Sequence, residues 1–418
     1  MKKLRWPLII LLILIILYQI PAPQADFFEL YQRQDQAARQ LREFMQRPVK
    51  TLTVDGITWR YLAGGQGAKT ILFLHGMGGA YNLWWQQVAA LQDRYRFITY
   101  TLPEEVDNLD KAAAGIRAIL DEEKAGKIYL VGTSMGGYIA QYLLNVMPQR
   151  IEKAVLSNTF PPNKQIAVAN AGKARAVKLM PEILVARLGA RQLQAKLLPA
   201  AQGDSLLAAF LPSLPFSKKR FLNRYRVVVD PFFDNPGSYA ARRIQKLIIE
   251  ADNDPLVEPD LRARLKERYA DARVFTFHNA GHFPYINRAA DYNAVLEAFL
   301  ASDNPYLAVE KVIYDNYAAG RRQADTVLLN QAFATQAVLN TNTAAGVVTI
   351  SLADYLDKVV ADGPQQLEVH ILDGRVAHRM ADFRVAFDYP GKRYIDNLVL
   401  LPTDRGWRIV NKTFASVK

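Results

Sequence analysis

The motif Gly-Thr-Ser-Met-Gly at residues 132–136 constrains the fold of this chain more than any other stretch. An apolar run at residues 127–131 precedes it and predicts a short buried strand, and a helical pattern follows it. Glycines on both sides of a serine are typical of a sharp strand-to-helix turn, where larger side chains would collide with the neighbouring strand or helix. The N-terminus of the following helix would direct its dipole and free N–H groups at Ser134. Ser134 is therefore a candidate nucleophile for a carbonyl, and the alternative is a chance match in a glycine-rich turn.

Strand and helix patterns alternate along residues 50–300. A hairpin is predicted at residues 52–61, with Asp55 and Gly56 as its tight turn. Beyond it, apolar strands alternate with helices, which indicates a mostly parallel sheet covered on both faces. The predicted strands span residues 70–74, 96–100, 127–131, 154–157, 246–250 and 272–277, and the predicted helices span residues 81–92, 109–123, 138–146 and 289–300.

Three loops at the ends of these predicted strands carry residues that suit a serine nucleophile. The glycines of residues 75–79 allow the backbone to approach a substrate, so an N–H group of this loop can bind an oxyanion. Asp254 follows the strand at residues 246–250 and can hold a histidine in the correct tautomer. His282 follows the last strand and can reach a serine at the end of the central strand.

Together these motifs resemble the α/β-hydrolase family over about residues 50–300, and the chain order Ser…Asp…His is the order that this fold uses. The resemblance implies that Ser134 is the nucleophile, that His282 is the general base and acid, and that Asp254 orients the histidine. It also implies that the N–H groups of Met77 and Met135 form the oxyanion hole. Such a site needs no cofactor and no metal.

Each assignment has a competitor in the sequence. His278 is an alternative base, although it lacks a preceding glycine and stands at a strand end. Asp252 and Glu250 are alternatives to Asp254, whose acid-x-x-Val spacing matches the family pattern better. His75 is interpreted as a structural residue that hydrogen-bonds its own loop.

One loop departs from the family pattern. Many members carry Asp-x-x-Gly-x-Gly after the strand that corresponds to residues 96–100, whereas this chain has Thr-Leu-Pro-Glu-Glu at residues 101–105. That loop usually shapes one wall of the site, so substrate specificity does not transfer from familiar esterases. A serine nucleophile also argues against haloalkane dehalogenase and epoxide hydrolase chemistry, which in this fold use an aspartate at that position.

Residues 161–239 interrupt the alternation and are interpreted as a helical lid over the site. The chain has a net charge of +12, and residues 164–226 hold twelve Lys and Arg against two acidic residues. Leucines lie between the basic residues, so such a lid could attract an anionic substrate or contact anionic lipid headgroups. The alternative is a solvated outer face with a packed inner face. No nucleic-acid recognition motif is visible, so we predict no nucleic-acid partner.

The first 23 residues predict a membrane segment. Basic residues within positions 2–5 precede an apolar run at residues 6–20, which just reaches the length of a spanning helix. The positive-inside rule then places the catalytic part outside the cytoplasm, as a single-pass anchored protein that is periplasmic if bacterial. A cleaved signal peptide, weakened by a proline at the candidate cleavage site, and a buried core helix are the alternatives. Residues 24–48 have the spacing of an amphipathic helix.

A turn-rich cluster at residues 302–305 predicts a boundary between a hydrolase-like domain, residues 49–302, and a second domain, residues 303–418. In the second domain a helical pattern leads into a strand. This arrangement resembles the cone-shaped α+β nuclear-transport-factor-2-like fold, in particular its lumazine-binding branch. The resemblance implies a binding module with a pocket on a curved sheet and a face for homodimerisation. Further strands are predicted at residues 367–372, 383–389, 394–401 and 407–412.

The candidate site predicts a serine hydrolase, a carboxylesterase or lipase-like enzyme that cleaves a small-molecule or lipid ester, or a thioester, through an acyl-enzyme. The alternative is a non-catalytic or weakly active binding scaffold that uses the hydrolase fold and the C-terminal domain, because a fold does not guarantee a reaction. Another serine-triad reaction, such as C–C bond hydrolysis, also fits the motifs. The chain has no cysteine, which excludes disulfides, thiolate zinc sites and a cysteine nucleophile.

Overall fold

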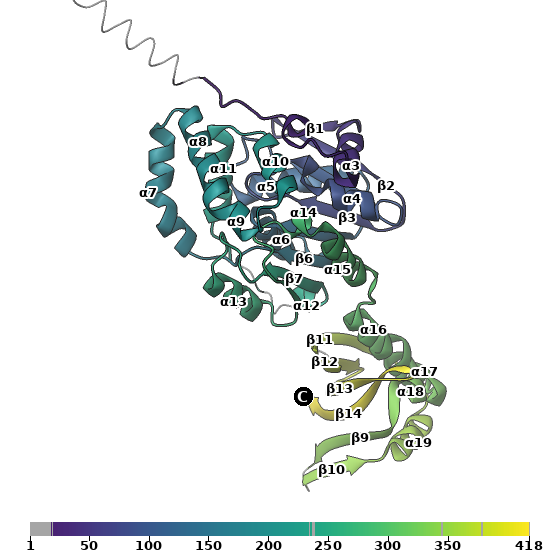
Figure 1. Ribbon diagram of the computed structural model, residues 1–418. Coiled ribbons are helices and arrows are strands. Elements are labelled where there is room, and N and C mark those ends of the chain that lie inside the picture. Colours follow the sequence, from purple (N-terminus) through teal and green to yellow (C-terminus); the bar gives the residue numbers. More distant parts are fainter. Residues whose placement is uncertain are drawn as a thin grey trace, which may run out of the picture. The chain divides into compact units, whose positions relative to one another are not determined.

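The computed structural model describes residues 18, 20–233, 235, 239–343, 346–377 and 379–417, and Figure 1 labels its elements. The chain forms two compact units. The first unit comprises residues 1–236 and 244–301, and the second comprises residues 237–243 and 302–418.

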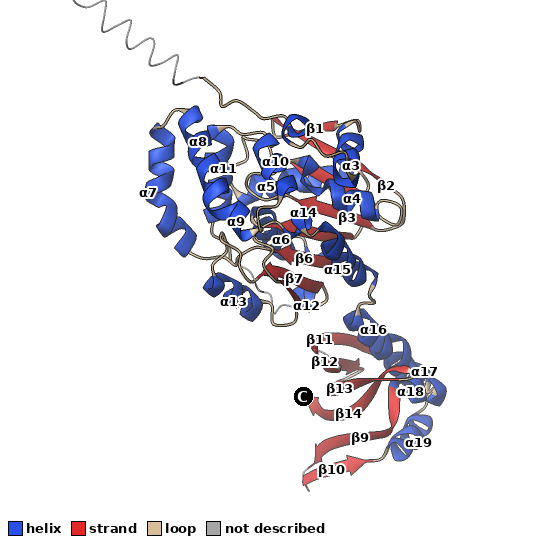
Figure 2. Cartoon of the chain, viewed as in Figure 1, coloured by secondary structure: helices blue, strands red, loops and turns tan. Residues whose placement is uncertain are grey.

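An eight-stranded sheet forms the centre of the first unit (Figure 2), in the order β1-β2-β4-β3-β5-β6-β7-β8. The pairs β1–β2 and β2–β4 are antiparallel, and all other neighbours are parallel. The predicted hairpin turn is confirmed, because Asp55 and Gly56 have φ values of 49° and 76°, as a two-residue type I′ turn requires. The strands are β1 (Lys50–Val54), β2 (Ile57–Gly65), β3 (Thr70–Leu74), β4 (Arg96–Thr101), β5 (Ile128–Thr133), β6 (Ile151–Ser157), β7 (Gln245–Ala251) and β8 (Arg273–Phe277).

Helices cover both faces of this sheet, as the alternating pattern predicts. Along β3, Ile71 and Phe73 pack into one hydrophobic cluster with α3, α4 and α15, whereas Leu72 and Leu74 pack into a second cluster with α5, α6 and α13. Every residue of β3 and β5 is buried, which explains why these strands are mostly apolar without an alternation of polar residues. The helices around the sheet are α3 (Gln36–Met45), η2 (Tyr81–Trp84), α4 (Trp85–Leu91), α5 (Leu109–Glu122), α6 (Met135–Val146), η3 (Pro148–Arg150), α13 (Pro259–Arg268), α14 (Pro284–Asn287) and α15 (Ala289–Ala301).

Residues 24–48, expected as one amphipathic helix, form two helices, α2 (Phe27–Leu30) and α3. The break has a local cause: the Asp35 side chain accepts the N–H of Ala38 and so caps the start of a new helix. Leu41 and Phe44 of α3 are buried in the first hydrophobic cluster. This segment therefore packs on the body of the first unit.

The predicted membrane anchor requires correction. Across the residues that the structure describes, no helix combines the length and the apolar character needed to cross a bilayer. The longest of them, α7 (Gln165–Leu179), has 15 residues, whereas a spanning helix needs about 20. The predicted single-pass anchor, and the localisation that depended on it, are therefore not supported by the part of the chain that the structure describes. Residues 1–17 and 19, on which most of that prediction depended, lie outside the described residues.

The segment between β6 and β7 is helical and differs in burial from its inner to its outer part. Leu207 and Phe210 of α10 are fully buried, as are Arg224 and Val227 of α11, whereas α7 has no buried residue. The basic residues of this segment therefore lie both on a solvated outer helix, α7, and in the interior, where Arg224 is buried. Its remaining helices are α8 (Glu182–Gln192), η4 (Leu193–Leu197), α9 (Leu198–Ala200), α10 (Ser205–Ser213) and α11 (Lys218–Val229).

The second unit contains a six-stranded sheet in the order β10-β9-β14-β13-β12-β11. All neighbours are antiparallel except β14–β9, which is parallel. One hydrophobic cluster joins this sheet to its helices. The elements are α12 (Tyr239–Arg242), α16 (Pro305–Lys311), η5 (Val312–Ala318), α17 (Ala319–Gln323), α18 (Thr326–Ala332), β9 (Phe333–Thr343), β10 (Gly346–Ile350), α19 (Leu352–Asp362), β11 (Glu368–Ala377), β12 (Met380–Tyr389), β13 (Lys392–Thr403) and β14 (Gly406–Val417).

Candidate active site

Ser134 occupies the turn between β5 and α6, with a backbone φ of 53° and ψ of −119°. Non-glycine residues rarely adopt positive φ, and such strain is typical of functional positions. The two flanking positions require glycine because the backbone approaches them closely. A Cβ added to Gly132 would lie 2.4 Å from Gly136 O, and a Cβ added to Gly136 would lie 2.2 Å from Leu74 O. The sequence motif therefore forms the sharp turn that its glycines predict.

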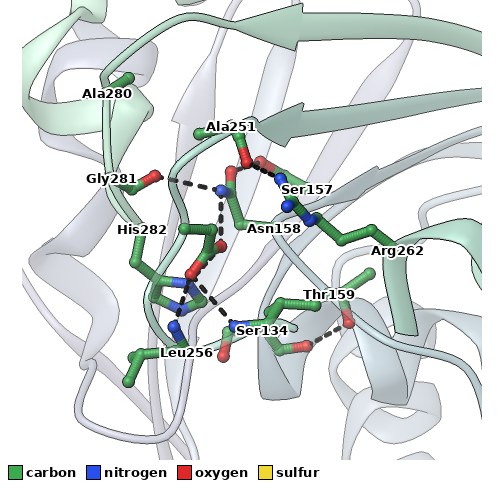
Figure 3. Close-up of polar contacts among 12 residues, drawn as sticks. Ser134, Ser157, Asn158, Thr159, Ala251, Leu256, Arg262, Ala280, Gly281 and His282 are labelled. Atoms are coloured by element: carbon green, nitrogen blue, oxygen red, sulfur yellow. Dashed lines mark hydrogen bonds and ion pairs between the residues drawn. The ribbon is translucent and has the colours of Figure 1, made fainter. Parts of the chain in front are cut away.

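The end of β6 holds the strained backbone of Ser134. Ser134 N–H donates to Ser157 O over 3.0 Å, and the Thr159 hydroxyl donates to Ser134 O over 2.7 Å. Figure 3 draws these residues together. Because both backbone polar groups of the serine are bound, the turn is fixed despite a strain of about 1–3 kcal/mol.

Asp254 and His282 form a buried acid–histidine pair. His282 Nδ1 lies 2.8 Å from Asp254 Oδ2 and 2.9 Å from Oδ1, and the two residues are 3% and 7% exposed. Burial raises the pKa of Asp254, but the opposing effects of His282 and of hydrogen bonds prevail and lower it overall. An ionised Asp254 accepts the Nδ1 proton and leaves Nε2 as a proton acceptor.

Asn158 is a site residue that sequence reasoning missed. Its Nδ2 donates to Asp254 Oδ2 over 2.9 Å and is 3.4 Å from Gly281 O (Figure 3). The signal that could have found it is the buried polar run at residues 157–159, directly after an apolar strand that pairs with the strand before Ser134.

Asp254 is held from a second side by its own loop. The N–H groups of Leu256 and Val257 donate to Asp254 Oδ1 over 2.9 Å and 3.2 Å. Both carboxylate oxygens are therefore bound, which fixes the carboxylate plane against His282.

The loop at residues 75–79 contains a peptide whose direction is fixed by two hydrogen bonds. Gly76 O accepts from His75 Nδ1 over 2.7 Å and from Gly79 N–H over 2.9 Å. In a trans peptide the N–H points away from the C=O, so these bonds also set the direction of Met77 N–H.

The two chain segments expected to form the oxyanion hole both approach the candidate nucleophile. A Cβ added to Gly76, which precedes Met77, would lie 3.3 Å from Ser134 Cβ. Met135 follows Ser134 and is the first residue of α6, so its N–H has no acceptor within the helix. These two N–H groups are suited to bind a carbonyl oxygen that becomes negatively charged.

His75 takes the structural role that the sequence favours. Its Nε2 accepts Leu102 N–H over 2.9 Å, so Nδ1 must carry the proton that binds Gly76 O. Burial, and after it the charge of Arg224, hold the pKa of His75 well below its usual range. The imidazole is therefore neutral and supports the loop.

The competing candidates lie elsewhere. His278 pairs with Asp252 at 2.8 Å on the surface, with 80% of the His278 side chain exposed. Glu250 accepts from Lys266 at 2.7 Å and from Thr276 at 3.1 Å. None of these contacts involves Asp254 or His282, so the structure brings together the pair that the spacing favours.

The second unit has a hollow of about 500 Å³ on its sheet. Oppositely charged residues face one another across β11 and β12 there, since Arg375 is paired with Asp382 and Asp373 with Arg384. In the part of the chain that the structure describes, no group of three or more His, Cys, Asp or Glu could hold a metal ion.

Two family profiles match the sequence. The Alpha/beta hydrolase family matches residues 71–295, more than half of the chain. The family described as "Putative lumazine-binding" matches residues 305–415, which confirms the expected nuclear-transport-factor-2-like domain.

Three curated relatives are similar to part of this chain. The dihydrolipoyllysine-residue acetyltransferase component of the acetoin cleaving system of Cupriavidus necator is 26% identical over 263 residues, 59% of this chain and 67% of the relative. Maspardin of Danio rerio is 25% identical over 264 residues, 60% of this chain and 82% of the relative. The 3-oxoadipate enol-lactonase 2 of Acinetobacter baylyi is 29% identical over 135 residues, 30% of this chain and 49% of the relative.

Solved structures share the fold of the first unit. A hydrolase from Pseudomonas aeruginosa PA01 has a TM-score of 0.54 at 20% identity, and covers 62% of this chain and 100% of its own. The enol-lactonase from Burkholderia xenovorans LB400 has a TM-score of 0.52 at 20% identity, and covers 60% of this chain and 100% of its own.

Proposed function

The chain belongs to the alpha/beta hydrolase family, and we propose that its first unit is a serine hydrolase that cleaves a carboxylic ester or thioester through an acyl-enzyme on Ser134. One arrangement carries this proposal. The segment at residues 157–159 binds both the backbone of Ser134 and the carboxylate of Asp254, which in turn binds His282. We infer that this shared support brings the nucleophile and the acid–histidine pair within reach of proton transfer.

In the first step, His282 Nε2 takes the hydroxyl proton of Ser134 while Oγ attacks the substrate carbonyl carbon. The N–H groups of Met77 and Met135 bind the negative charge that forms on the carbonyl oxygen. The C–O or C–S bond then breaks, and the alcohol or thiol leaves with the proton from His282. Water, deprotonated by the same histidine, attacks the acyl ester, releases the carboxylic acid and restores the Ser134 hydroxyl.

The relatives support an acyl substrate. An enol-lactonase is named for a lactone, which is a cyclic ester, and an acetyltransferase component is named for an acetyl group. Both names concern a carbonyl bonded to a heteroatom, which is the group that a serine nucleophile attacks. That chemistry supports the proposed ester or thioester substrate, and a panel of esters with different acyl lengths measures the preference.

The test uses the full chain, a fluorophosphonate probe and short p-nitrophenyl esters. The wild type is expected to hydrolyse the esters and to carry the probe on Ser134, and Ser134→Ala is expected to do neither. Asp254→Asn should lower kcat by about 10⁴-fold if the carboxylate sets the histidine tautomer. The matched control is Asp252→Asn, which removes the neighbouring carboxylate that pairs with His278 on the surface and should retain activity.

Two outcomes would contradict the proposal, and each favours a different alternative. A folded wild type that neither turns over esters nor reacts with the probe would contradict the proposal and favour a binding scaffold. A wild type that binds the probe but turns over only a vinylogous diketone would favour C–C bond hydrolysis over ester cleavage.

A further inference from the structure

Arg224 is a buried cation for which the proposed reaction gives no direct role. It lies on α11, within the helical segment between β6 and β7, and has no exposed surface. Its three hydrogen bonds all go to backbone carbonyls rather than to a carboxylate. Burial, and after it the charge of Arg220, lower the pKa of Arg224 to about 9, so the guanidinium stays charged at neutral pH. Burying a charge without a carboxylate partner is energetically unfavourable, so the position of Arg224 calls for a compensating role.

The carbonyls that Arg224 binds belong to the loop that carries the candidate oxyanion donor. Nη1 donates to Met77 O over 2.7 Å and to Gly79 O over 2.8 Å. Nη2 donates to Leu102 O over 3.0 Å, and the backbone N–H of Leu102 donates to His75 Nε2. The guanidinium and His75 therefore bind different carbonyls of the turn at residues 76–79.

The helix that carries Arg224 is itself fastened to the body of the first unit. Asn223 Nδ2 donates to Glu104 O over 2.7 Å, and Ser217 Oγ donates to Glu104 Oε2 over 2.8 Å. Just beyond the other end of α11, Tyr138 OH donates to Asp230 O over 2.7 Å. The loop at residues 101–105, which departs from the family pattern, is thus the loop that holds α11 in place.

We propose that Arg224 is a positioning residue for the oxyanion hole. It fixes the carbonyls of Met77 and Gly79. It thereby fixes the turn whose Met77 N–H donates a hydrogen bond to the oxyanion. This inference rests on the proposed serine hydrolase function. It makes α11 a structural part of the catalytic site, because two nitrogens of one planar guanidinium bind carbonyls of two loops, whereas an ammonium donates from a single nitrogen.

The test compares Arg224→Met, Arg224→Lys and the control Arg226→Met in the full chain. Arg226 lies on the same helix, is 59% exposed and contacts Asp107 at 3.6 Å, so its substitution removes the same charge without touching the loop. Two quantities are measured: kcat and KM for a p-nitrophenyl ester, and the inhibition constant of a trifluoromethyl ketone, whose tetrahedral adduct places an oxyanion in the hole.

Arg224→Met is expected to lower kcat by about tenfold or more with KM changed less than about twofold, and to weaken the ketone by the same factor as kcat/KM, because a displaced oxyanion donor acts on the transition state. Arg224→Lys is expected to fall between Arg224→Met and the wild type, and Arg226→Met should match the wild type within about twofold. If Arg224→Met does not fold, Arg224→Lys carries the test, with a loss of at least about threefold in both quantities.

Two results would overturn the inference separately from the proposed function. An active wild type with Arg224 variants that match Arg226→Met, or variants that raise KM without weakening the ketone, would remove Arg224 from the oxyanion hole and leave the hydrolase intact. A wild type without esterase activity or probe labelling would overturn both.

Discussion

Asn158 donates a hydrogen bond from Nδ2 to Asp254 Oδ2 over 2.9 Å, although the two residues are 96 positions apart in the chain. Asn158 has a φ of 43°, in the left-handed region that asparagine tolerates better than most residues. The residues on either side of it bind the backbone of Ser134. One strand end therefore positions both the acid and the nucleophile, so changes at Asn158 should alter the reaction more than the fold.

Asn158→Asp is expected to disable the site at low pH while sparing the fold. The substitution keeps the size of the side chain and its tolerance of positive φ, but it places a second carboxylate beside Asp254. Two adjacent carboxylates share a proton, so the pKa that governs ionisation of the pair rises and the acid limb of kcat/KM should move up by about 1 pH unit or more. The measurement is the pH–rate profile for a p-nitrophenyl ester.

The control for that experiment is Asn158→Gly, which accepts a φ of 43° and only removes the hydrogen bond to Asp254. It should lower kcat a few-fold and leave the acid limb where it is. An acid limb that stays in place in Asn158→Asp would contradict the role assigned to this contact.

Thr159→Val is expected to loosen the serine turn. Valine matches threonine in shape but lacks the hydroxyl that donates to Ser134 O over 2.7 Å. Because Thr159 is 2% exposed, water does not replace the lost donor, and the free energy of unfolding should fall by about 1 kcal/mol. The rate of fluorophosphonate labelling should fall several-fold. Thr159→Ser, which keeps the hydroxyl, should label at nearly the wild-type rate, and equal rates in the two variants would argue against this support.

Gly136→Ala and Gly172→Ala are expected to change stability in opposite directions. A Cβ at Gly136 would lie 2.2 Å from the backbone oxygen of Leu74, which cannot move away without shifting β3. The unfolding free energy should therefore fall by about 3 kcal/mol or more, and soluble expression should suffer. Nothing lies within 4 Å of a Cβ at Gly172 in α7, so alanine there should stabilise by about 0.5–1 kcal/mol. Urea titrations of both variants give the comparison.

The elements that sequence predicts best are those that depend on local pattern. The strand at residues 70–74 has the predicted bounds because all five residues are buried on a two-sided sheet. The turn around Ser134 is predictable because glycine is the residue that such close approach demands. In contrast, β9 has no regular alternation of burial and β10 is almost wholly exposed, so the periodicity of the second unit is weaker there.

The supports of the site are harder to predict. Arg224 and Met77 are 147 positions apart, and the contact joins a side chain to a backbone carbonyl. Every residue type has a backbone carbonyl, so such a contact leaves no pattern of residue types in the sequence. The twelve basic residues of the helical segment likewise look equivalent in sequence, and only the fold separates a buried guanidinium from its solvated neighbours.

The neutral state of His75 predicts a specific loss of stability in mild acid. Burial and the Arg224 charge hold its pKa well below 6.5 in the folded chain, whereas the unfolded chain binds a proton near pH 6.5. The unfolded state therefore binds more protons below pH 6.5, and the contribution of His75 to stability is fully present above that pH and declines below it. From pH 7.5 to pH 5.5 this decline amounts to at most about 1.4 kcal/mol.

The measurement is urea unfolding at pH 7.5 and 5.5, followed by the fluorescence of Trp59, Trp84 and Trp85, which are buried in the first unit. His75→Gln should be less stable than the wild type at pH 7.5 because it loses the hydrogen bonds to Gly76 and Leu102. Because glutamine does not titrate, the difference between the two proteins should narrow by about 1 kcal/mol at pH 5.5. His278→Gln removes an 80% exposed histidine and should leave the wild-type pH dependence largely in place. A wild type and a His75→Gln variant that lose stability in parallel would mean that His75 is protonated in the folded chain, and its assigned tautomer beside the oxyanion loop would have to be abandoned.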